Sequence, residues 1–179
     1  MEDGLDILIS RLRDQEGKPF WQKLEAITRR REFHLIENGI FSALGTEAPD
    51  LECLLDAARK VVAFGYTVYL LLNPQGVKSA DFIFERKGIY RLYELKTITG
   101  QNSVGNRLKE AVSQSNRVIL NIRTQYNLRK LAKEVKRFFM ISGEIVEILV
   151  LIRGKQLSVN RQSADKRSFE SDFRKELRK

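Results

Sequence analysis

The stretch that decides the fold is SADFIFERKGIYRLYELK, residues 79–96. It contains two runs rich in β-branched and aromatic residues, 80–85 and 89–96, which are typical of strands. Lys87 and Gly88 lie between the runs, and the glycine tolerates the positive φ that a tight turn requires. The pattern therefore predicts a β-hairpin with a two-residue loop.

The register of this hairpin brings three ionisable residues together. With a two-residue loop, Asp81 lies directly opposite Glu94, and directly opposed Cβ atoms are about 4.5–5.5 Å apart. Lys96 is two residues beyond Glu94 and points to the same face of its strand. A loop of four residues keeps this register, whereas a loop of three residues does not.

Two opposed carboxylates repel each other, and a divalent cation between them removes that cost. Mg²⁺ and Mn²⁺ prefer oxygen ligands, and Mg²⁺ commonly takes one or two carboxylates with water and substrate phosphate. Such an ion polarises the phosphate and activates a water, while a lysine deprotonates the water or stabilises developing charge. Asp81, Glu94 and Lys96 are therefore candidates for phosphodiester hydrolysis. An ordinary surface ion pair around Lys96 is the alternative explanation.

Helix and strand patterns alternate around the hairpin. Apolar residues recur at helical spacing in some segments, and β-branched or aromatic runs mark others. The sequence predicts a helix that starts at residues 49–50 and is ended by Gly65, and helices over residues 103–116 and 127–139. It also predicts strands over residues 66–72, 117–122 and 145–153, and a turn at residues 73–76. We therefore expect an α/β fold in which helices flank a mixed central sheet.

The two ends of the chain differ in composition from this centre. Residues 1–45 are strongly charged and indicate an added N-terminal helical region, before a core over residues 46–160. Residues 161–179 form a basic C-terminal tail in which Phe169, Phe173 and Leu177 recur every four residues. This spacing predicts either a short amphipathic helix that docks on the body or a tail that orders on binding.

The composition narrows the classes of function. The 179 residues carry a formal net charge of +9, which favours a polyanionic partner, nucleic acid first. The single cysteine excludes an intrachain disulfide. With only one histidine as well, the chain has few ligands for a zinc site and few residues for a Ser-His hydrolase. The start of the chain is acidic, and its apolar stretches are too short to span a membrane. We expect no membrane partner and a cytoplasmic site of action, with delivery as the end of a longer secreted chain as an option.

Short motifs in the central region resemble those of known nucleases. Ser79-Ala80-Asp81-Phe82 followed by Glu94-Leu95-Lys96 resembles the D-x(n)-E-x-K signature of the PD-(D/E)XK superfamily, whose core has the element order αβββαβ. More narrowly, residues 50–122 resemble the C-terminal tRNA-nuclease toxin domain of CdiA proteins, which act in contact-dependent inhibition. The further segments that carry this resemblance are Asp56-Ala57-Ala58, Gly65-Tyr66, Ser113-Gln114-Ser115 and Val118-Ile119-Leu120.

The resemblance implies roles for individual residues. Asp81 and Glu94 would bind Mg²⁺ or Mn²⁺, and Lys96 would be the catalytic lysine. An acidic residue of the first core helix would add a ligand, with Asp56 preferred to Glu52. The resemblance also implies an RNA substrate, with tRNA favoured, and an acidic immunity protein. The same chemistry fits a DNA endonuclease of restriction or repair type, and a non-catalytic nucleic-acid-binding or assembly module on the same fold is the remaining alternative.

Side chains on two predicted helices are candidates for contacts with nucleic acid. On the helix after the hairpin, Asn106, Glu110 and Gln114 share one stripe, and Arg107 and Lys109 are adjacent. Gln114 also joins the catalytic candidates because it lies in a segment that carries the CdiA resemblance. The helix from Asn127 has a basic face that suits phosphate groups, made of Arg129, Lys133, Lys136 and Arg137. For both helices an ordinary solvated face is the alternative.

Overall fold

The computed structural model describes residues 4–12, 15–44, 48–72, 78–101 and 104–178, and the chain divides into two compact units. Unit 1 is Met1–Glu94 and unit 2 is Leu95–Lys179. The predicted turn at residues 73–76, and Ser103 at the start of a predicted helix, lie outside the described residues. The unit boundary falls within the expected core, so the units do not coincide with the three zones of the sequence, whose status as domains stays a prediction.

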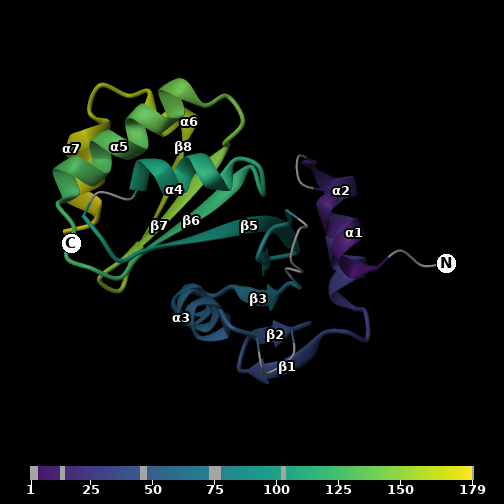
Figure 1. Ribbon diagram of the computed structural model, residues 1–179. Helices are drawn as coiled ribbons and strands as arrows, with labels where there is room; N and C mark the ends of the chain where they lie inside the picture. The colour runs from purple at the N-terminus through teal and green to yellow at the C-terminus, as the bar shows by residue number, and fades with distance from the viewer. Residues whose placement is uncertain (1–3, 13–14, 45–47, 73–77, 102–103, 179) are drawn as a thin grey trace. The chain divides into compact units, whose positions relative to one another are not determined.

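Unit 1 combines helices with a mixed sheet (Figure 1). Its strands follow the order β1 to β5, in which β2 and β3 are parallel and the other neighbours are antiparallel. Strand β5 runs on into unit 2. The elements are α1 (Leu5–Ser10), α2 (Lys18–Thr28), β1 (His34–Glu37), β2 (Ile40–Ser42), α3 (Leu51–Val62), β3 (Thr67–Leu70), β4 (Phe82–Arg86) and β5 (Ile89–Ile98).

Helices α1 and α2 form one apolar cluster with the β4/β5 hairpin. Leu24 of α2 is fully buried, and the cluster includes Ile83 of β4 and Leu92 of β5. Helix α3 packs against β2 and β3, and its buried side chains recur at helical spacing. The chain leaves α3 through Gly65, whose φ of 83° suits a glycine. The helix predicted to start at residues 49–50 and to end at Gly65 is confirmed, with Leu51–Val62 as its helical residues.

Unit 2 repeats the combination of parallel and antiparallel strand pairs. Strands β6 and β7 are parallel, and β7 and β8 are antiparallel. The amide of Arg123, just after β6, donates to the carbonyl of Ile98 at the end of β5. The elements are α4 (Val104–Ala111), β6 (Arg117–Ile122), α5 (Leu128–Ile141), β7 (Glu147–Ile152), β8 (Lys155–Asn160), α6 (Arg161–Ala164) and α7 (Phe169–Glu176).

The core of unit 2 lies between its strands and the helices α4, α5, α6 and α7. Figure 1 shows α4 and α5 lying across β6 and β7, and α7 also contributes to this core. Phe169, Phe173 and Leu177 are at most 4% exposed, so the C-terminal segment is a docked amphipathic helix, the first of the two predicted states. The expected α/β fold with helices against mixed strands is confirmed in each unit, and α3 to β6 have the element order αβββαβ.

Three local expectations need correction. The N-terminal region is not wholly helical, because β1 and β2 form a hairpin around Asn38 and Gly39, a turn pair that the charged composition obscured. No strand was predicted over residues 155–160, where the structure has β8. This strand follows β7 through a turn at Arg153 and Gly154, and its sequence lacks a strong apolar alternation. Helix α4 ends at Ala111 rather than at residue 116.

Candidate active site

The β4/β5 hairpin has the predicted loop and register. Arg86 pairs with Ile89, which leaves Lys87 and Gly88 as the two loop residues, with φ values of 53° and 75°. Positive φ at both positions is the geometry of a type I′ turn. The carboxylate of Glu85 accepts a hydrogen bond from the Gly88 amide at 2.7 Å. This turn fixes the pairing of the two strands back to Phe82 and Tyr93.

The regular ladder ends just before Asp81. The Asp81 amide donates to the carbonyl of Tyr93 at 3.0 Å, although Tyr93 is already the ladder partner of Phe82. Two consecutive residues thus face one residue, which is the pattern of a β-bulge. Asp81 is therefore displaced from the ladder position directly opposite Glu94 that a regular hairpin would give it. On its other side, the Asp81 carbonyl accepts from the Leu71 amide at 2.9 Å.

Asp81 and Glu94 are buried carboxylates of unit 1. Asp81 is 8% exposed and Glu94 is 2% exposed. Carboxylates are seldom buried to this extent unless they are paired or bind a cation. Their oxygen atoms suit a hard divalent ion, with water and a phosphate as the remaining ligands. Among the described residues there is no group of three or more His, Cys, Asp or Glu side chains arranged for a metal ion.

Lys96 and Gln114 meet in unit 2. The ammonium of Lys96 donates to the Gln114 side-chain oxygen at 3.2 Å. Gln114 lies in the turn after α4, where its backbone N–H donates to the Ala111 carbonyl at 2.9 Å. Because α4 ends early, Gln114 leaves the helical stripe that it was expected to share with Asn106. The structure thus pairs two of the predicted catalytic residues by a route that helical spacing did not foresee.

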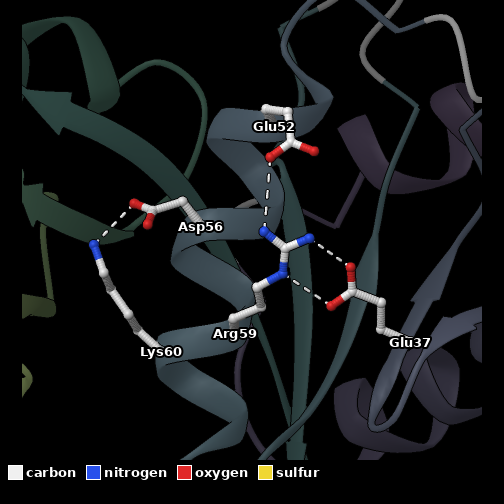
Figure 2. Close-up of polar contacts among 5 residues, drawn as sticks. All are labelled: Glu37, Glu52, Asp56, Arg59 and Lys60. Carbon is white, nitrogen blue, oxygen red and sulfur yellow. Dashed lines mark hydrogen bonds and ion pairs between the residues drawn. The ribbon is translucent and has the colours of Figure 1, made fainter.

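The two carboxylates of α3 both have cationic neighbours (Figure 2). Asp56 lies 2.8 Å from Lys60, one turn further along the helix. Glu52 is exposed and lies 3.6 Å from Arg59, which also binds Glu37 of β1 with two hydrogen bonds of 2.6 and 2.9 Å. The hydrogen bonds from Arg59 lower the pKa of Glu37 below its usual value. A metal-binding role for Glu52 or Asp56 stays a prediction, and these ion pairs compete with it.

The candidate nucleic-acid contacts lie on the outer faces of two helices of unit 2. On α4, Asn106, Arg107 and Lys109 are exposed, and Arg107 forms an ion pair with Glu110 at 3.1 Å. On α5 the inner face is buried, while the four predicted cations are exposed or partly exposed. None of the four forms an ion pair with any residue that the structure describes: Arg129, Lys133, Lys136 and Arg137.

A cavity of about 360 Å³ in unit 1 was not foreseen from the sequence. Aromatic and cationic side chains of β4, β5 and the chain before β3 line it, together with Lys87 of the turn and Ile89. The signal was available as alternation, since Phe84 and Arg86 on β4, and Arg91 and Tyr93 on β5, are each two residues apart. This aromatic–cationic cavity is lined by Tyr66, Phe84, Arg86, Lys87, Ile89, Arg91 and Tyr93.

Within the described part of the chain, no helix has the length and apolar character needed to cross a lipid bilayer.

One family model matches part of the chain. The model of the family described as "Contact-dependent growth inhibition CdiA C-terminal domain" matches residues 78–157. A comparison with curated proteins finds no match. A solved structure described as "CdiA-CT/CdiI toxin and immunity complex from Burkholderia pseudomallei" is similar, with a TM-score of 0.45 and 10% identity over 65% of this chain and 92% of that chain. The segment that holds Asp81, Glu94, Lys96 and Gln114 is therefore similar to the C-terminal domain of CdiA.

Proposed function

We propose that this chain is a metal-dependent endonuclease of the PD-(D/E)XK type that acts as an RNase toxin domain. The observation that carries the proposal is the burial of two carboxylates, Asp81 and Glu94, at the start of β4 and in the middle of β5. Two buried carboxylates in one hairpin supply oxygen ligands of the kind that a shared divalent cation prefers. The match to the CdiA family covers both residues and supports the toxin assignment.

The two carboxylates and the lysine would have different roles in the reaction. Asp81 and Glu94 would hold Mg²⁺ or Mn²⁺ through their carboxylate oxygens. When bound, the ion supplies Lewis-acid polarisation of the scissile phosphate and a water of lowered pKa. Lys96 follows Glu94 by two residues on β5, so the alternation of a strand gives both the same face. The bond to Gln114 restrains the Lys96 ammonium, which then orients the attacking water or stabilises charge on the phosphate.

The substrate and partners follow from the family likeness and the charge. RNA, and tRNA in particular, is favoured by the resemblance to CdiA toxin domains, and the cytoplasm is where such a substrate would be met. The net charge of +9 suits a polyanion and also suits an acidic immunity protein. Delivery as the end of a longer secreted protein would fit the family description. The basic face of α5 would bind backbone phosphates.

A cleavage assay tests the proposal. Purified protein is incubated with total tRNA and, separately, with plasmid DNA, in Mg²⁺, Mn²⁺ or EDTA. We expect tRNA to be cut only with a divalent ion, and we expect Asp81→Asn, Glu94→Gln and Lys96→Met each to lower the rate about 100-fold or more. Glu144→Gln is the matched control, because Glu144 is an exposed carboxylate in the turn before β7.

Each outcome has a defined meaning. Cleavage of DNA in preference to tRNA would replace the RNase assignment by a DNA endonuclease. Variants that cut as fast as the parent would show that the active site lies elsewhere. No cleavage of either substrate in any metal would refute the nuclease function and favour a non-catalytic binding module.

A further inference from the structure

The aromatic–cationic cavity has the parts of a nucleotide-binding site. We propose that it binds one unpaired nucleotide of a single-stranded nucleic acid, with the base against the aromatic wall and the phosphate against the cations. The inference goes beyond cleavage, because this binding needs neither Asp81 nor Glu94 nor Lys96. The volume of the cavity, about 360 Å³, falls within the usual range for small-ligand pockets, about 300–1,000 Å³.

The cavity and Glu94 lie on opposite faces of the hairpin. Phe84 pairs with Arg91, and alternation along β5 gives Tyr93 the same face as Arg91. Ile83 and Leu92 form the other face, where they join the apolar cluster with α1 and α2. Glu94 is two residues from Leu92 and shares that second face. The cavity therefore lies on the face of the hairpin opposite to Glu94.

The planar groups that the cavity wall offers for stacking are Tyr66 and Arg86, because the rings of Phe84 and Tyr93 beneath them are each only 1% exposed. The ring centroids of Phe84 and Tyr93 are 4.6 Å apart, and those of Tyr66 and Phe84 are 5.8 Å apart. The guanidinium of Arg86 lies over the Tyr66 ring at 5.0 Å, which adds a planar cation supported by an aromatic ring. Unpaired bases stack on aromatic rings and on guanidinium planes of this kind.

The charges around the cavity are those that a phosphate requires. Arg86, Lys87 and Arg91 are its ionisable side chains apart from the two tyrosines, and no carboxylate lines it. None of the three forms an ion pair with another residue in the described ranges. An acidic peptide would satisfy the cations but would leave the stacked planes unused. The combination therefore favours a nucleotide over an acidic peptide.

A second hairpin provides a matched control for the charge at the turn. Lys87 and Arg153 each occupy the first position of a two-residue loop, with φ values of 53° and 52°, and each is followed by a glycine. Lys87 lines the cavity, whereas Arg153 belongs to the β7/β8 turn of unit 2. Lys87→Glu and Arg153→Glu change the net charge equally and place the same residue in the same backbone geometry.

The test measures binding in EDTA by fluorescence anisotropy, with a labelled single-stranded oligouridylate as probe and inorganic polyphosphate as competitor. We expect Lys87→Glu and Arg91→Glu to weaken oligouridylate binding about tenfold or more and to lower the salt slope by about 0.7 for each lost phosphate contact. Arg153→Glu should weaken binding less than twofold. Tyr66→Leu should bind oligouridylate about tenfold more weakly but polyphosphate nearly as well as the parent does. Tyr66→Phe should retain its affinity for both ligands.

Two outcomes would overturn the inference. One is an equal loss of oligouridylate affinity in Lys87→Glu and Arg153→Glu, which would show that the net charge of the protein alone attracts the oligonucleotide. The other is a Tyr66→Leu protein that remains folded and binds oligouridylate as the parent does. If Tyr66→Leu does not fold, the comparison of the two turn variants decides. Because cleavage is absent in EDTA, a failed cleavage assay leaves this test valid, and failure of this test leaves the cleavage assay valid.

Discussion

Glu147 joins three strands of unit 2 through its two carboxylate oxygens. One oxygen lies 3.1 Å from Nε of Arg117 on β6, and the other accepts from the Ser158 hydroxyl of β8 at 2.7 Å. The Arg117 and Glu147 side chains are only 10% and 12% exposed. Breaking a buried ion pair leaves an uncompensated charge, whereas replacing both partners by apolar residues does not.

We therefore predict that Glu147→Gln lowers the free energy of unfolding by about 3 kcal/mol, measured by urea denaturation. The double variant Arg117→Met/Glu147→Leu should lose less than the single variant. The control is Glu110→Gln, because Arg107 and Glu110 are also 3.1 Å apart but about half exposed, and such pairs contribute about 0–1 kcal/mol. Equal losses from Glu147→Gln and Glu110→Gln would contradict the role of burial.

Tyr126 makes the stability of the protein sensitive to alkaline pH. Burial, and then the hydrogen bond from its hydroxyl to Glu134 at 2.7 Å, raise the pKa of Tyr126 well above its usual value of 10.0. As pH rises past about 10, the unfolded chain loses the phenol proton first, so the free energy of unfolding falls. Below that pH the contribution is fully present.

We predict that Tyr126→Phe flattens the decline in stability above about pH 10. The substitution also removes a hydrogen bond to a carboxylate and should lower the free energy of unfolding by about 1.5–3 kcal/mol at pH 7. Urea denaturation at several pH values would measure both effects. Part of the decline should persist in the variant, because burial also raises the pKa of Tyr69 and Tyr90. Parallel pH profiles for parent and variant would show that Tyr126 makes no such contribution.

The candidate site shows what single residues reveal in a sequence. Asp81, Glu94 and Lys96 could be selected because the hairpin register follows from a two-residue turn and the alternation of strands. The displacement of Asp81 from the position opposite Glu94 could not be predicted, because it depends on the hydrogen bond from the Asp81 backbone amide to the Tyr93 carbonyl. The Lys96–Gln114 bond was equally hidden, since it requires α4 to end before Gln114.

At the scale of elements, α5 is defined at both ends by side chains. Asn127 accepts hydrogen bonds from the amides of Arg129 and Lys130 at 2.9 and 3.2 Å, so it is an N-cap. At the other end, the guanidinium of Arg161 donates to the carbonyls of Phe139 and Ser142. Both ends of the helix therefore satisfy backbone groups that have no partner within the helix.

We predict that Asn127→Ala lowers the free energy of unfolding by about 1 kcal/mol, because it removes an acceptor from the first turn of α5. Asn127→Ser should cost only a few tenths, since serine also caps well. Thermal or chemical unfolding measures both. A loss from Asn127→Ser as large as that from Asn127→Ala would mean that the amide side chain acts through other contacts.

Elements with strong local patterns could be predicted, and weak ones could not. Helix α3 lies within the segment that its apolar spacing indicates, and strand β6 has the predicted bounds. Strands β1 and β8 were missed because they carry few apolar residues and are defined by pairing with β2 and β7. In such strands the tertiary partner supplies the information that local propensity lacks.

At the scale of the whole molecule, the charge could be interpreted early but its distribution only in part. A net charge of +9 indicated a polyanionic partner. The helical spacing predicted the cations along the outer face of α5 in unit 2, whereas only the structure shows that cations also gather at the aromatic–cationic cavity in unit 1. The family match at residues 78–157 extends across the boundary at Glu94 and Leu95, so it describes neither unit alone.

Strand β5 has a consequence for how this chain can be inherited. Modules usually recombine between compact units, yet here the boundary falls within a strand, between Glu94 and Leu95. A genetic exchange at that boundary would separate Glu94 from Lys96 and divide the strand itself. A chain that exchanged one half at that boundary would keep only one of the two residues from each parent, so the original pair is inherited intact only when the exchange falls outside residues 94–96 of β5.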